Sequence, residues 1–285
     1  MRYSERFRVE PGKELKLSAI DPDYKEKHES KESADAELAQ LTRKLRDLQY
    51  LIYAENRRSV LICLQGLDAA GKDGAINHVL GAMNPQGTRV CSFKVPSKEE
   101  AAHDFLWRVH QRAPAKGEVV VFNRSHYEDV LVTRVHGLVA KDVWSKRYEL
   151  INDFERNLLE SGTLILKFYL HISEEEQLER FRQRLDDPAR QWKISESDYS
   201  ERAMWPEYVV AYEQALARTS TRHAPWYVIP ANHKWYRNLA ISRIVVEALE
   251  ALGMELPPAT VDVEEIRHKY HAAAARVARR GKAPS

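Results

Sequence analysis

Long apolar runs are missing from this sequence, and so is a cysteine framework. No stretch reaches the length and apolarity of a membrane span, and the start, MRYSERFRVEPGKEL, has no signal-peptide hydrophobic region. The two cysteines, Cys63 and Cys91, lie in apolar strand-like runs, which indicates buried thiols in a reducing compartment rather than disulfides. We therefore expect a cytoplasmic protein with no membrane partner.

Net charge and metal-binding histidine patterns are also missing. Lys plus Arg number 44 and Asp plus Glu 42, so cations that bind a polyanion must be clustered locally. The 11 histidines show no metal-ligand spacing and give no reason to predict a zinc site. The six tryptophans are typical of core or lid packing rather than of a base-stacking platform, and we expect no nucleic-acid partner.

Strand-like and helical patterns alternate along most of the chain. The strand-like segments are short, rich in Val, Ile, Leu or aromatics, and without polar alternation, which is typical of parallel strands buried on both faces. They cover residues 60–65, 89–95, 118–122, 163–171 and 226–230. Helical patterns cover residues 38–55, 75–83, 98–111, 127–135, 143–160, 174–185, 209–216 and 239–252. This alternation predicts a three-layer α/β/α domain with a five-stranded parallel sheet and right-handed crossovers.

Three segments stand outside this alternation. Residues 1–30 are polar and rich in turn residues, and we expect an irregular N-terminal arm. Residues 179–208 are charged and interrupt the pattern before the last strand, as an inserted helical lid would. Residues 257–285 form a basic tail that we expect to fray. No internal repeat or Gly/Ser linker divides the chain, so we expect a single domain over residues 1–285.

In the stretch LICLQGLDAAGKDGAI, residues 61–76, the seven residues from Gly66 to Lys72 match the first seven positions of a P-loop, directly after a strand and before a helix. Such a loop aims backbone N–H groups and a helix N-terminus at a phosphate. Lys72 would bridge the phosphates being parted. A glycine-containing turn in a fold that binds no phosphate is the less favoured interpretation. The predicted substrate-binding positions of the loop are Gly66, Ala69, Ala70, Gly71, Asp73 and Gly74.

Two carboxylates in this loop are unusual for a phosphate site. Asp73 stands where a hydroxyl usually holds Mg²⁺, and its first-turn position also suits the helix dipole, which is the favoured interpretation. Asp68 would repel a polyphosphate unless a divalent cation or a transferable proton lies between them. We therefore expect Asp68 to be functional.

A second cluster, EVVVFNRSHYEDVLVTR at residues 118–134, begins where a buried strand ends. Asn123 stands where P-loop enzymes usually have Asp, and Arg124 suits bidentate phosphate contact or an ion pair with a neighbouring acid. Ser125 and Glu128 have the spacing of a capping box, which gives Glu128 a structural role. Asp129 has no such role, and we expect it to face the crevice as a metal ligand or a base.

A third cluster, EEEQLERFRQRLDDPARQWK at residues 174–193, carries several arginines. Arg180 and Arg184 share one helix face, and Arg182 and Arg190 lie nearby in the sequence. The helix is either a solvated charged surface or a closing lid whose arginines neutralise a phosphoryl group in transfer.

With these residues in view, the sequence resembles the polyphosphate kinases of the second type, a branch of the P-loop kinases. The resemblance rests on the motifs GLDAAGKDG at 66–74, FNRSHYEDVLV at 122–132, LHISEEEQ at 170–177, PWYVIPAN at 225–232 and KWYRN at 234–238. It implies phosphoryl transfer between inorganic polyphosphate and AMP, ADP or ATP, with guanine nucleotides as further candidates. Mg²⁺ is the implied cofactor, with Mn²⁺ as a substitute, and members that accept both AMP and ADP are the most similar.

The resemblance also implies roles for single residues. Asp68, Lys72 and Asp129 would form the catalytic centre, with Asp68 and Asp129 as the metal ligands. Phosphates would be held by Arg124 and by the lid arginines Arg180 and Arg184, with Asn123 beside them, and the polymer by a basic groove that includes Arg134. A homo-oligomer is expected, for which the helices at 38–55 and 143–160 could serve either an interface or the core.

Two other functions fit parts of the pattern. An ATP-dependent nucleoside monophosphate kinase would share the fold and the lid, but the GKDG sequence and Asn123 argue against it. A nucleotide-sensing or polyphosphate-binding module would need no turnover, whereas Asp68, Lys72 and Asp129 together indicate catalysis.

Overall fold

A computed structural model describes residues 2–26 and 30–280. Its sheet has five parallel strands in the order β2-β3-β1-β4-β5, which confirms the predicted α/β fold. The strands are β1 (Ser59–Gln65), β2 (Thr88–Ser92), β3 (Val119–Asn123), β4 (Thr163–His171) and β5 (Trp226–Pro230). All five overlap the predicted segments, and the phosphate-loop motif follows the central strand β1.

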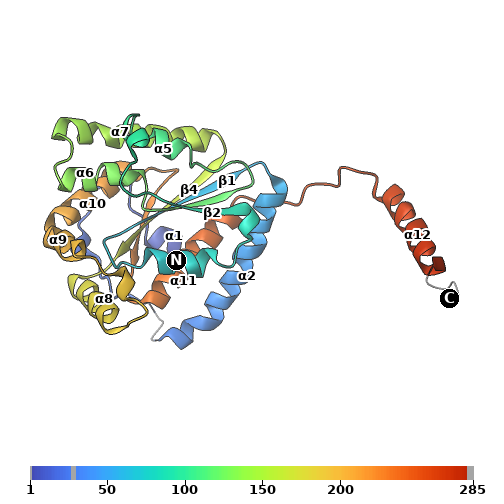
Figure 1. The fold of residues 1–285 in the computed structure, drawn as a ribbon, viewed down its shortest axis with the longest axis horizontal. Helices are drawn as coiled ribbons and strands as arrows, with labels where there is room; N and C mark the ends of the chain where they lie inside the picture. Colours follow the sequence, from blue (N-terminus) through green and yellow to red (C-terminus); the bar gives the residue numbers. More distant parts are fainter. Residues whose placement is uncertain (1, 27–29, 281–285) are drawn as a thin grey trace. The chain divides into compact units, whose positions relative to one another are not determined.

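Helices cover both faces of the sheet (Figure 1). The core on one face includes residues of α1 (Tyr3–Arg6), α2 (Lys31–Glu55), α3 (Lys72–Ala75) and α11 (Lys234–Glu250). The two cores on the other face include residues of α5 (Trp107–His110), α6 (Val132–Val135), α7 (Lys141–Glu160) and α10 (Trp205–Thr219). Three further α-helices lie between residues 98 and 203: α4 (Lys98–Ala101), α8 (Glu174–Asp186) and α9 (Ser197–Ala203).

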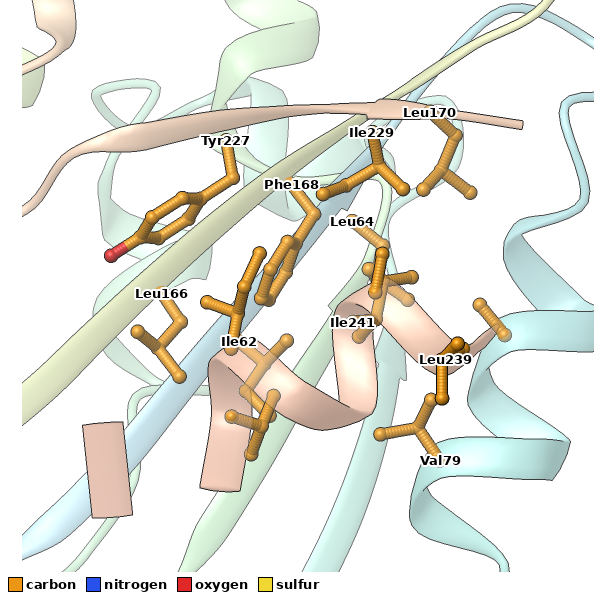
Figure 2. Packing of buried hydrophobic residues seen from close by; sticks show 14 of the residues in the cluster. Ile62, Leu64, Val79, Leu166, Phe168, Leu170, Tyr227, Ile229, Leu239 and Ile241 are labelled. Atoms are coloured by element: carbon orange, nitrogen blue, oxygen red, sulfur yellow. The ribbon is translucent and has the colours of Figure 1, made fainter. Parts of the chain in front are cut away.

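Alternate residues of the strands enter different cores, which explains why no polar alternation is visible in the sequence. Ile62 of β1 and Phe168 of β4 face α11, as Figure 2 shows, whereas Leu61 and Ile165 pack on the opposite face. Full burial of such a side chain stabilises the fold by roughly 1.5–3 kcal/mol. The sheet is therefore a rigid support for the loops at its carboxyl edge.

Two predicted helices are broken in the structure. Residues 98–111 form α4 and α5 with a turn between them, where the Asp104 carboxylate accepts a hydrogen bond from the backbone N–H of Leu106 at 3.0 Å. Such local side-chain bonds compete with helix formation. Residues 127–135 form the 3-10 helix η4 (His126–Asp129) and the short α6. Residues 75–83 are helical at first, since α3 continues into the π-helical turn η2 (Ile76–Leu80).

The N-terminal arm is more ordered than its polar sequence predicts. The backbone N–H of Val9 donates to the Trp226 carbonyl at 2.8 Å, and the N–H of Val228 donates to the Phe7 carbonyl at 2.9 Å. This antiparallel pairing covers the free edge of β5, and Tyr3 is also buried. Of the predicted arm, residues 1 and 27–29 lie outside the described residues.

The chain divides into two compact units, Met1–Met254 and Glu255–Ser285, where the sequence predicted one domain and a frayed tail. The second unit contains α12 (Val263–Arg280), an 18-residue helix whose side chains are exposed over residues 263–278. Residues 281–285 of the predicted tail lie outside the described residues. None of the described helices is both long and apolar enough to span a membrane.

A buried charged network lies under the turn that follows β3. The Lys167 ammonium donates to Glu155 Oε2 at 2.6 Å, to the Tyr127 hydroxyl at 3.0 Å and to the Thr219 carbonyl at 2.7 Å. All three of its donors are used. Burial alone would raise the pKa of Glu155, but the charge of Lys167, together with the hydrogen bonds from His126 and Lys167, outweighs burial and holds that pKa below its usual value. The network ties η4 to β4, α7 and the end of α10.

Replacing Lys167 should reveal what this network contributes. Lys167→Met leaves the Glu155 carboxylate buried without its cation, and we expect the free energy of unfolding to fall by about 3–5 kcal/mol in urea titrations. The matched control is Lys44→Met, which breaks the exposed pair with Glu250 at 2.7 Å. That change should cost less than about 1 kcal/mol. Equal losses in the two variants would contradict a stabilising role for the buried pair.

Candidate active site

The loop from Gly66 to Gly71 joins the end of β1 to the start of α3. Gly71 has φ +99°, and a Cβ there would lie 1.9 Å from Nη1 of Arg237, so glycine is required both by conformation and by space. Ala69 has φ +62°, a conformation that a non-glycine residue adopts rarely. Strained backbone of this kind is concentrated at ligand sites.

A cavity of about 1060 Å³ opens over this loop. Among the described residues, 21 line it, and nine of these are cations whereas two are acids. The cations are Lys72, Lys94, Arg124, Arg180, Arg184, Arg190, Lys193, Lys234 and Arg237, and the acids are Asp68 and Asp73. Because the total charge of the chain is near neutral, a polyanion can be attracted only by a local cluster of cations, and this cavity provides one.

Lys72 and Asp68 lie in the loop itself. The Lys72 ammonium donates to the Gly66 carbonyl at 2.6 Å, and burial lowers its pKa although the Asp68 charge opposes the shift. Arg124, which follows β3, donates from Nη2 to Asp68 Oδ1 at 3.0 Å. Arg124 also has a positive φ of +60°, so the site holds strained backbone at the ends of two neighbouring strands.

Asp73 lies on the cavity and contacts two other elements. The Asn123 amide donates to Asp73 Oδ1 at 2.8 Å, and Lys193 Nζ lies 3.6 Å from Asp73 Oδ2. Lys193 belongs to the 3-10 helix η5 (Gln191–Lys193) of the predicted lid segment. Asp73 therefore joins the loop to β3 and to η5, in addition to its favourable first-turn position.

The placement predicted for Asp129 is wrong. Its carboxylate forms ion pairs with Arg147 at 3.2 Å and Arg108 at 3.7 Å, and it does not line the cavity. Burial raises the pKa of Asp129, and the two arginines oppose that shift. The residue therefore anchors η4 to α5 and α7, and the structure does not bring it together with Asp68.

The capping box predicted for Ser125 and Glu128 is also wrong. Ser125 Oγ accepts from the Tyr127 N–H at 3.3 Å and from Gln65 Nε2 at 3.1 Å, within a 3-10 turn rather than an α-helix. Glu128 Oε2 instead lies 3.7 Å from Nη1 of Arg124. Glu128, rather than Asp129, is thus the acid of this turn that faces Arg124 and the phosphate loop.

Arg180 lines the cavity, but its hydrogen bonds are directed into the protein. Nη1 donates to the Ala69 and Ala70 carbonyls at 2.8 and 3.0 Å, and Nη2 donates to the Ala231 and Asn232 carbonyls at 2.6 and 2.9 Å. Nε donates to Glu176 at 2.6 Å. Because a guanidinium has five N–H donors, none is left for a phosphate. The predicted catalytic contact of Arg180 is therefore replaced by a role in shaping the loop.

The other predicted arginines divide between the cavity and its surroundings. Arg184 lines the cavity and lies 3.5 Å from Asp198 of α9. Arg134 does not line it, because its Nη1 donates to Gln214 at 2.8 Å and to the Tyr148 hydroxyl at 3.3 Å between α6, α7 and α10. The predicted polymer contact of Arg134 is not supported by this placement.

The phosphate loop and its cation-lined cavity agree with the proteins to which this chain is similar. Residues 28–256 match the family model described as Polyphosphate kinase 2 (PPK2). The AMP/ADP-polyphosphate phosphotransferase of Meiothermus ruber is 52% identical over 92% of this chain and 98% of its own length. The ADP-polyphosphate phosphotransferase of Rhodopseudomonas palustris is 43% identical over 90% of this chain and 93% of its own.

This chain belongs to the polyphosphate kinase 2 family. The crystal structure of polyphosphate kinase 2 from Arthrobacter aurescens has the same fold, with a TM-score of 0.92 and 42% identity. That match covers 95% of this chain and 97% of the other. The family resemblance inferred from the motifs is therefore confirmed over nearly the whole chain.

Several residues that line the cavity were not predicted as site residues. Lys193 lines the cavity from η5, Lys234 and Arg237 line it from the first turn of α11, and Lys94 lines it from the segment after β2. The sequence held a partial signal, since KWYRN at 234–238 contributed to the family resemblance. Nothing in its spacing indicated that its side chains reach the loop, which lies more than 160 residues earlier in the chain.

In the structure Glu128, rather than Asp129, contacts the site through Arg124, and paired variants of the two acids test this assignment. Asp129→Asn should lower the free energy of unfolding by about 1–3 kcal/mol, because the buried Arg108 and the half-buried Arg147 lose their carboxylate, while the folded fraction keeps its kcat. Glu128→Gln should lower kcat/KM and leave stability nearly unchanged. Urea titration and kinase assays on both variants measure this. Loss of kcat in folded Asp129→Asn would restore the catalytic role predicted from the sequence.

The acidic side of the pH profile should depend on Glu128. Burial raises the pKa of Glu128 above its usual 4.5, although Arg124 opposes the shift. On acidification Glu128 therefore takes up its proton before an exposed glutamate does, and the ion pair with Arg124 is lost. We expect kcat/KM to fall with an apparent pKa above 4.5, and Glu128→Gln to remove this limb. An unchanged limb in that variant would assign it to another group.

Proposed function

We propose that this chain transfers phosphoryl groups between inorganic polyphosphate and the nucleotides AMP and ADP, forming ADP and ATP as the polymer shortens. The observation that carries the proposal is the excess of nine cations over two acids around the cavity at the phosphate loop. Such an excess of positive charge suits a long chain of phosphates better than it suits a single triphosphate. The names of the Meiothermus ruber and Rhodopseudomonas palustris relatives, given above, support the same reaction.

The residues of the site suit this transfer without covalent catalysis. A terminal phosphoryl group of the donor lies at the loop N–H groups and Lys72, and Arg124 approaches it from the end of β3. An anionic phosphate oxygen of the nucleotide attacks the phosphorus, and the bond to the bridging oxygen of the polymer breaks. Because the attacking oxygen carries no proton at neutral pH, no general base is needed. The protein contributes alignment and positive charge.

Mg²⁺ is the proposed cofactor, with Mn²⁺ able to replace it. Among the described residues no group of three or more acid, His or Cys side chains could hold a metal alone. The donor chemistry still fits, because Mg²⁺ usually binds one or two carboxylates together with substrate phosphates and water. Asp68 and Asp73 both present carboxylates to the cavity and would hold it. When bound, the ion neutralises phosphate charge. Asp129, engaged with Arg108 and Arg147, is not proposed as a ligand.

A donor assay distinguishes this function from an ATP-dependent nucleoside monophosphate kinase. Purified protein incubated with Mg²⁺, long-chain polyphosphate and either AMP or ADP should form ADP or ATP with no other phosphoryl donor. Parallel reactions with GMP and GDP establish whether guanine nucleotides are also accepted. Product formation from AMP only when ATP is supplied would contradict the proposal and favour the monophosphate kinase.

Lys72→Met tests the role of the loop. The change keeps the length of the side chain but removes the charge that approaches the transferring group, and we expect kcat to fall at least a hundredfold, or by about 2.7 kcal/mol. Thermal unfolding should remain close to that of the wild type, because the ammonium contacts only loop carbonyls at 2.6 and 3.3 Å. Addition of EDTA to the wild type should likewise stop turnover. Near-normal kcat in Lys72→Met would rule out this role.

We also propose that the enzyme acts in the cytoplasm, where its nucleotide substrates are found, and forms a homo-oligomer. Exposed apolar side chains support an interface on the two helices that the sequence singled out. Tyr50 and Tyr53 lie on α2, and Val143 and Leu150 on α7, all at least 43% exposed. Light scattering on the purified chain measures the oligomeric state, and a monomer at micromolar concentration would contradict this part of the proposal.

A further inference from the structure

Arg237 of α11 is a buried cation beside the phosphate loop. The residue is 2% exposed, yet it lines the cavity. Its guanidinium occupies space that two glycines leave open, since a Cβ on Gly71 would lie 1.9 Å from Nη1 and a Cβ on Gly74 would lie 3.0 Å from Nη2. The loop and the first turn of α3 therefore hold this side chain in close contact.

The hydrogen bonds of Arg237 differ from those of its neighbour Arg180. Nε and Nη2 donate to the neutral amide oxygen of Asn238 at 3.1 and 2.8 Å, and Nη1 has a long contact of 3.5 Å to the Ala70 carbonyl. At most three of its five N–H donors are satisfied within the part of the chain that the structure describes. Arg180, in contrast, uses all five and has the Glu176 carboxylate.

Arg237 also lacks an acidic partner. Among the described residues no carboxylate lies within ion-pair distance of it. Other cavity arginines each have one: Arg124 pairs with Asp68 at 3.0 Å, Arg184 with Asp198 at 3.5 Å and Arg190 with Asp187 at 2.9 Å. The charge of Arg237 is therefore compensated by dipoles alone.

The position is electrostatically unfavourable for the protein without a ligand. Nη1 of Arg237 and Nη1 of Arg180 lie 1.9 and 3.6 Å from the point where a Cβ of Gly71 would be. Burial, followed by repulsion from Arg180, lowers the pKa of Arg237 to about 9, so the group is still charged at neutral pH. A buried charge without a counter-charge destabilises a fold, and folds retain such groups where function requires them.

We propose that Arg237 is a phosphate-binding residue of the donor site, whose unsatisfied N–H groups bind a phosphate of the polyphosphate chain held at Gly71 and Gly74. This inference rests on the proposed function. It assigns Arg237 to the polymer rather than the nucleotide because the residue packs against the phosphate loop itself. The guanidinium suits the task, since it can donate two parallel hydrogen bonds to one phosphate group.

Thermal unfolding with and without polyphosphate, in the absence of nucleotide, tests the proposal. Arg237→Gln keeps hydrogen-bonding capacity but removes the charge. Without ligand, its Tm should equal or exceed that of the wild type, because an uncompensated buried cation is gone. Its affinity for long-chain polyphosphate, from the concentration dependence of the Tm increase, should fall roughly ten- to a hundredfold, as expected for charged hydrogen bonds. The KM for ADP should change little.

The matched control is Arg182→Gln, on an exposed arginine that is paired with Glu179 and Asp186 and does not line the cavity. It should bind polyphosphate like the wild type. Arg237→Lys, which keeps the charge but not the fork, should bind with intermediate affinity. Wild-type affinity for polyphosphate in Arg237→Gln overturns the inference. A purely structural role is shown instead if Arg237→Gln has a lowered Tm while Arg237→Lys has both the Tm and the polyphosphate affinity of the wild type. If polyphosphate fails to raise the Tm of the wild type, the proposed donor itself is wrong.

Discussion

The geometry of the site depends on the five hydrogen bonds of Arg180. They join α8 to two carbonyls of the phosphate loop and to two carbonyls after β5, so one side chain fixes three segments that are far apart in the sequence. Gln177 of the same helix adds a bond to the Asp68 carbonyl at 3.0 Å. With the loop carbonyls held from behind, backbone N–H groups of the loop can face the cavity, apart from that of Ala70, which donates to the Leu67 carbonyl at 3.1 Å. The loop is thus shaped before any substrate arrives.

The backbone of the site could be predicted from the sequence because its signals are local. Each strand is a short apolar run, and the strand order places the ends of β1 and β3 side by side, so that Asp68 and Arg124 meet. Glycine spacing and the following lysine identified the phosphate loop. These features depend on neighbours in the chain, which periodicity and motif spacing describe well.

Side-chain partners could not be predicted in the same way. Glu128 and Asp129 are adjacent in a 3-10 turn, where successive side chains point roughly 120° apart, so one faces Arg124 while the other faces Arg108 and Arg147. The sequence pattern predicted an α-helix there, and for that reason Asp129 rather than Glu128 was expected to face the site. Arg180 and Arg237 depend on contacts with residues more than a hundred positions away, which no local pattern records.

The pairing of the N-terminal arm with β5 has a consequence for the order of folding. Phe7 and Val9 bond to Val228 and Trp226, so the first residues to leave the ribosome wait for β5, the last strand of the sheet. At a synthesis rate of about 5–20 residues per second, this interval lasts on the order of ten to forty seconds. The other four strands can assemble meanwhile, and docking of the arm then seals the newest edge of the sheet. Completion of the fold is thereby coupled to translation of the second half of the chain.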